Sequence, residues 1–77
     1  MSAIRVYVNS RGIDVPLGAT MLDAVRVHDT RLAQLVIDGE RALTDSRGLP
    51  LSPDARAFSG AIVRVVSAKH RASEEGQ

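Results

Sequence analysis

The side chains in this sequence that most often carry out chemistry, histidines and paired carboxylates, are widely spaced. The two histidines, His28 and His70, lie far apart, and the only adjacent acidic pair, Glu74-Glu75, stands near the C-terminus. A catalytic centre needs a nucleophile, a base or a metal held beside a partner group. The sequence contains no glycine-rich phosphate loop, Ser-His-Asp arrangement or nucleophile elbow. We therefore expect no enzyme activity and no catalytic residues.

Metal and cofactor sites are also not expected. The chain has no cysteine, which excludes disulfides, thiolate zinc sites and Cys-ligated iron–sulfur clusters. Histidine ligands usually occur in clusters. His28 is therefore interpreted as a structural residue beside the apolar stripe of a helix, and His70 as part of the solvated basic stretch Lys69-His70-Arg71.

The charge distribution disfavours nucleic acid and membrane as partners. Ten Lys and Arg residues against nine Asp and Glu give a net charge of +1, and the only aromatic residues are Tyr7 and Phe58. Nucleic-acid binders of this size usually show a basic cluster with aromatics on which bases stack. No apolar run approaches the roughly 18 residues of a membrane span, and no basic-then-apolar leader precedes the first predicted strand. We expect a soluble, cytoplasmic protein.

Hydrophobic periodicity predicts the elements. Residues 4–8 and 13–17 alternate like an N-terminal hairpin, with Ile13, Val15 and Leu17 inward and Pro16 at the end of an edge strand. Thr20 is a good N-cap, with Asp23 three residues on, and the helix is expected to end near Asp29-Thr30.

The second half of the chain reads as strands and a long loop. Residues 34–37 and 40–43 are predicted to form a short hairpin through a type I′ turn at Asp38-Gly39. Residues 44–59 read as an irregular crossing loop, held to the core by Leu49, Leu51 and Phe58. Residues 61–66 form the most strand-like run.

This order of elements predicts an α+β protein of the β-grasp (ubiquitin-like) class, with a mixed four- to five-stranded sheet packed on one helix. Residues 1–68 are expected to form this single domain, and residues 69–77 a mobile polar tail. The stretches 13–25 (IDVPLGATMLDAV), 35–40 (LVIDGE) and 59–63 (SGAIV) resemble the thiamine sulfur-carrier and molybdopterin-synthase small-subunit families.

The functional ending of those families is missing. The resemblance implies a C-terminal Gly-Gly whose carboxylate is adenylated, yet no Gly-Gly occurs in the chain. The terminal Gly76-Gln77 is similar to the Gly-Gly-Gln end of prokaryotic ubiquitin-like modifiers, which are joined to lysines. A carrier or modifier acting through a processed tail therefore stays as the alternative hypothesis.

The leading hypothesis is a non-enzymatic protein-binding module or small accessory subunit. The alternation places Arg5 and Tyr7 of the first strand, and Ile62, Arg64 and Val66 of the last, on the open face of the sheet, with Val36 adjoining. An apolar centre that includes an aromatic residue, with arginines at its rim, is typical of protein-binding patches. Exposed β-branched residues are also ordinary on sheets, so both interpretations stay open. The partner would be another protein, and self-association is a further option.

Overall fold

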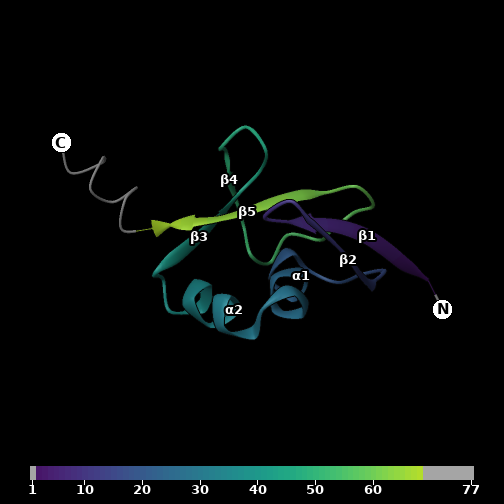
Figure 1. Ribbon diagram of the computed structural model, residues 1–77, viewed down its shortest axis with the longest axis horizontal. Helices are drawn as coiled ribbons and strands as arrows, with labels where there is room; N and C mark the ends of the chain where they lie inside the picture. Colours follow the sequence, from purple (N-terminus) through teal and green to yellow (C-terminus); the bar gives the residue numbers. More distant parts are fainter. Residues whose placement is uncertain (1, 69–77) are drawn as a thin grey trace.

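The computed structural model describes residues 2–68 and contains a five-stranded sheet with two helices against one face (Figure 1). The elements are β1 (Ala3–Val8), β2 (Arg11–Pro16), α1 (Met21–His28), α2 (Thr30–Ile37), β3 (Arg41–Thr44), β4 (Pro50–Leu51) and β5 (Ile62–Ser67). The strand order is β2-β1-β5-β3-β4. Strands β1 and β5 are parallel, and the other neighbours are antiparallel. The predicted α+β class and mixed sheet are confirmed, but the expectation of one helix is wrong.

The β1–β2 hairpin closes through a two-residue turn at Asn9-Ser10. Both residues have positive φ, 51° and 73°, the signature of a type I′ turn, whose twist matches that of the flanking strands. Asparagine tolerates this conformation better than most residues. Because the turn needs only two residues, Gly12 lies inside β2 rather than in the turn. Pro16 ends β2 at the sheet edge, as the sequence predicts.

Helix α1 begins with a complete capping box. The Thr20 hydroxyl accepts from the Asp23 backbone N–H at 3.1 Å, and the Asp23 carboxylate accepts from the Thr20 backbone N–H at 3.0 Å. These two bonds satisfy two of the four N–H groups that a helix start leaves unpaired. The helix ends at His28, as predicted, because Asp29 adopts an extended conformation.

Helix α2 replaces the strand predicted at residues 34–37. The Asp29 carboxylate caps it by accepting from the backbone N–H groups of Arg31 and Leu32. Ala33 and Val36 are buried while Ile37 is 53% exposed, the spacing of a helix that covers a sheet. Val36 therefore lies in the core, and the prediction that it adjoins the open face is wrong.

The Asp38-Gly39 pair ends α2 and is not a hairpin turn. Gly39 has φ +85°, its N–H donates to the Val36 carbonyl, and the Glu40 N–H donates to the Leu35 carbonyl. This pair of bonds is the Schellman helix ending, which favours glycine at the left-handed position. A type I′ turn and this helix ending both favour Asp-Gly, so the dipeptide alone does not distinguish them.

The core lies between the helices and the sheet. It is built from small and medium apolar residues: Val6, Val8, Val15, Ala19, Met21, Ala24, Val25, Ala33, Val36, Leu43, Ala57, Ala61 and Val63. Leu51 packs against it as predicted. Leu17, Leu49 and Phe58 do not, because their side chains are 65%, 53% and 61% exposed.

The crossing loop is held by its backbone and by alanines instead. The Ala57 N–H donates to the Ala19 carbonyl, and the Met21 N–H donates to the Ala55 carbonyl, both at 2.8 Å. These bonds hold the loop beside the start of α1. Ala57 is buried there, whereas the next residue, Phe58, is exposed.

Candidate functional site

The open face of the sheet carries all five residues that the sequence assigns to a binding patch. Val6, Val8 and Val63 are fully buried under the helices, so the alternating residues of β1 and β5 point the other way. Tyr7 and Ile62 are register partners on the two parallel strands. They are 38% and 46% exposed, and therefore place two partly accessible apolar residues on neighbouring strands of the open face.

The remaining three residues surround this pair. Arg5 precedes Tyr7 on β1, while Arg64 and Val66 follow Ile62 on β5. Arg64 pairs across to Thr44 and Val66 to Ala42 on β3. Both arginines are exposed, and Val66 is half-buried. The structure thus gathers an aromatic, two aliphatic residues and two cations on one face, which we call the open-face patch.

Gly12 is a further residue of this patch. The predicted second strand began at residue 13 and left Gly12 out, whereas β2 begins at Arg11. It lies opposite Tyr7 in the β1–β2 register. A Cβ built on Gly12 would approach the Tyr7 Cε1 atom to 3.1 Å and the Arg5 side chain to 3.2 Å. The Tyr7 ring and Arg5 therefore lie across β2, in space that a side chain at position 12 would occupy. A glycine inside a strand is the signal for such close approach.

The two arginines of the patch differ in their electrostatic state. The Arg5 Nε atom donates to the Asp14 carboxylate at 2.8 Å across the β1–β2 register, and this hydrogen bond raises the pKa of Arg5. Arg64 has no ion pair or side-chain hydrogen bond to any part of the described chain. The patch thus has an arginine paired with a carboxylate, Arg5, at one end and an arginine without an ion pair in the described chain, Arg64, at the other.

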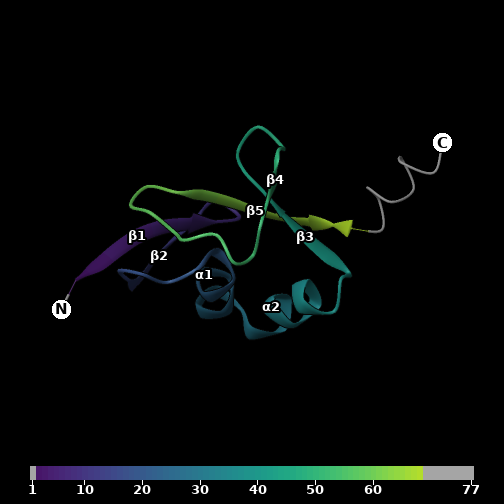
Figure 2. The same cartoon turned by 180° about the vertical axis from the view of Figure 1, so that it is seen from behind.

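The β3–β4 connection rises on the side of the sheet that faces away from the helices (Figures 1 and 2). Asp45 builds this loop, since its carboxylate accepts from the backbone N–H groups of Arg47 at 2.8 Å and Leu49 at 2.9 Å. The Leu49 bond is the main reason that the pKa of Asp45 is lowered. Thr44, just before the loop and beside Arg64, is only 4% exposed.

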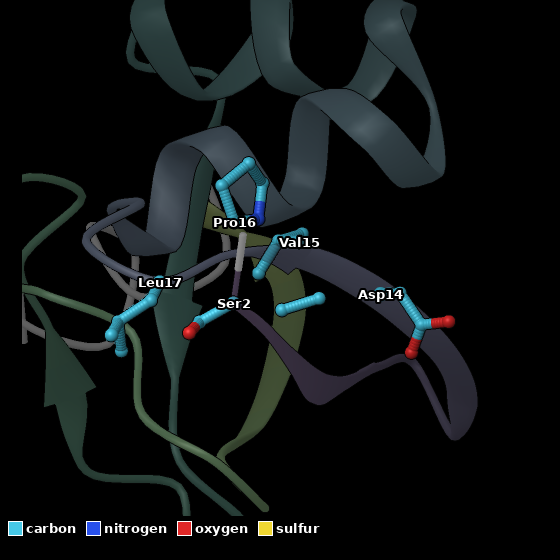
Figure 3. Close-up of a pocket in the computed structure, with 6 residues that line it drawn as sticks. Ser2, Asp14, Val15, Pro16 and Leu17 are labelled. Atoms are coloured by element: carbon cyan, nitrogen blue, oxygen red, sulfur yellow. The ribbon is translucent and has the colours of Figure 1, made fainter.

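A shallow pocket lies at the end of the β1–β2 hairpin that is away from the Asn9-Ser10 turn, where β1 begins and β2 ends (Figure 3). It is lined by Ser2, Ala3, Asp14, Val15, Pro16 and Leu17. The only charged side chain in it, Asp14, is already paired with Arg5.

The other candidate residues add no site. His28 is half-buried at the end of α1, and within residues 2–68 its Nδ1 atom has no hydrogen-bond partner. The same residues contain no group of three or more potential metal ligands. No helix among them has the length and hydropathy to cross a membrane. His70, Glu74, Glu75 and the tail residues Gly76 and Gln77 lie outside the described part of the chain.

These observations define a class of protein: an α+β ubiquitin-like domain, recognised by its sheet order, with an uncovered face opposite the helices. Among solved structures, the chain is similar to the ubiquitin-like domain of the Mycobacterium tuberculosis type VII secretion system protein ECCD1. The identity is 19%, the TM-score is 0.49, and the similarity covers 87% of this chain and 100% of that domain. No protein-family profile and no curated protein matches the sequence. The fold assignment therefore rests on the strand order and pairing.

Proposed function

We propose that this chain is a non-enzymatic protein-binding module, or a small accessory subunit, that binds its partner through the open-face patch. The observation that carries the proposal is the pairing of Tyr7 with Ile62 across the parallel strands β1 and β5. Both side chains are exposed on the open face. Isolated exposed apolar residues are ordinary on protein surfaces, whereas contiguous ones with a polar rim are typical of interaction sites.

The composition of the patch supports binding of another protein. Aromatic residues and arginine are enriched at the centre of interfaces, because they combine a large apolar area with hydrogen-bonding groups. The patch has one of each at its centre and rim, Tyr7 and Arg64, on the rigid strands β1 and β5. A surface built on strands loses little conformational entropy when it binds.

The test is a double substitution, Tyr7→Ala with Ile62→Ser, in the tagged 77-residue chain. Both side chains point away from the core, so we expect the circular dichroism spectrum and the unfolding midpoint to stay close to wild type. Capture of the partner protein from native lysate should be abolished.

A matched control replaces one aromatic and one isoleucine elsewhere, Phe58→Ala with Ile37→Ser. These residues are 61% and 53% exposed and lie outside the patch, so the control should capture the partner like wild type. Equal capture by the patch variant and the control would overturn the proposal. Light scattering of each purified variant tests the self-association option, since a homodimer through the patch would dissociate in the patch variant alone.

A further inference from the structure

We propose that the open-face patch recognises an apolar protein segment that carries a carboxylate, and that the carboxylate binds at the Arg64 end and not at the Arg5 end. This inference rests on the proposed function and adds the chemistry and orientation of the partner. It is carried by the different electrostatic states of the two arginines on one face.

The acidic side chains of the described chain are largely engaged elsewhere. Asp14 binds Arg5, and Asp38 accepts from the Gln34 side chain. Asp23, Asp29 and Asp45 accept from backbone N–H groups at helix starts and in the β3–β4 loop. None of these carboxylates contacts Arg64. The charge on the β5 side of the patch is therefore uncompensated within residues 2–68.

The position of Arg64 suits a paired contact. It is two residues beyond Ile62 on the same strand face, which corresponds to about 6.6 Å along the strand. One short segment can therefore place an apolar side chain on Tyr7 and Ile62 and a carboxylate on Arg64. A guanidinium binds a carboxylate through two parallel hydrogen bonds, which fixes orientation as well as adding affinity.

Phosphate would also bind a free guanidinium, but a nucleic acid fits this face less well. Strands of nucleic acid need several cations along their path and aromatic platforms for the bases. The patch offers one unpaired arginine and one tyrosine, whose ring lies across Gly12. Acidic peptide is therefore the occupant that the geometry favours.

The experiment is selection from a displayed library of random peptides, about 12 residues long, against the immobilised 77-residue chain. The baits are wild type, Arg64→Glu, and the control Arg56→Glu, which makes the same charge change at an exposed residue beside the start of α1. Wild type and the control should enrich peptides with Asp or Glu next to apolar residues. Arg64→Glu should enrich Lys or Arg instead, and should bind the wild-type peptides about tenfold more weakly.

The outcomes separate this inference from the proposed function. Peptides without acidic enrichment, or with enrichment unchanged by Arg64→Glu, overturn the charge assignment. If Ile62→Ser still abolishes their binding, the patch remains a protein-binding surface. Peptides indifferent to both substitutions overturn both proposals, as does a library that yields no binder. Arg64-dependent binding of a fluorescent single-stranded DNA 20-mer at low salt, without peptide binding, would also overturn the inference.

Discussion

The side-chain carbonyl of Asn9 accepts a hydrogen bond from the backbone N–H of Val65 at 3.0 Å, across 56 positions of sequence. Strand β1 turns away after Val8, so β5 runs out of a parallel neighbour at this point. The Asn9 backbone N–H also donates to the Val63 carbonyl at 3.0 Å. One residue thus forms the hairpin turn and extends the contact between the two strands that carry the patch.

We expect substitutions at Asn9 to separate these two roles. Asn9→Gly keeps the positive φ but removes the side-chain acceptor, and should lower the free energy of unfolding by about 1 kcal/mol. Asn9→Ala also places a Cβ in the left-handed region, which should cost about a further 1 kcal/mol. Urea unfolding measures both. Equal stability of the two variants would contradict the strain at this turn.

The Asp29 cap should stabilise α2, the helix that contains the residues predicted as a strand. Asp29→Ala removes the acceptor for the Arg31 and Leu32 N–H groups and should cost about 1 kcal/mol. Asp29→Asn should retain most of the stability, because asparagine caps helices comparably well. Hydrogen exchange should show the loss of protection in α2 first. Asp54→Ala, a loop substitution, is the control. Unchanged α2 exchange in Asp29→Ala would contradict this assignment.

Gly12→Ala should displace the Tyr7 ring with little effect on stability. The added Cβ meets the flexible ends of two side chains, and removing a strand glycine stabilises by roughly 0.5–1 kcal/mol, so the net change should stay within about 1 kcal/mol. The Tyr7 ring resonances should shift, and partner binding should weaken. In the Tyr7→Ala background the same substitution should have no further effect on binding; an undiminished effect there would show that the ring is not the mediator.

Acid should destabilise the fold through two carboxylates. The backbone hydrogen bond from Thr20 lowers the pKa of Asp23, with contributions from the Thr20 hydroxyl contact and Arg26. The bonds from Leu49 and Arg47 do the same for Asp45. A carboxyl whose pKa is lower in the folded state contributes stability above its unfolded pKa, about 3.9, and loses it as the pH falls through the folded value.

Urea unfolding as a function of pH tests this linkage. Asp23→Asn and Asp45→Asn should each show a shallower loss of stability between about pH 5 and pH 2 than wild type. A wild-type slope in Asp23→Asn and Asp45→Asn would contradict the assignment of the acid sensitivity to these two groups.

The strand alternation of β1 and β5 made the core and open faces of those strands predictable from sequence. Val6 and Val8 on one side and Tyr7 on the other follow from the two-residue period of a strand. The start of α1 was equally predictable, because Thr20 and Asp23 act on backbone groups within one turn. Interactions of this kind are local, so a short stretch of sequence contains both partners.

Tertiary structure decided the remaining features. Residues 34–37 suit a strand or a helix, and capping by Asp29 with packing against the sheet selects the helix. Close approach of the crossing loop to α1 buries Ala57 and leaves Phe58 exposed. The hairpin register places Gly12 beneath Tyr7 and Asp14 beside Arg5, which leaves Arg64 as the patch's free cation. Each of these outcomes depends on which distant residues meet, and local patterns along the chain do not reveal those contacts.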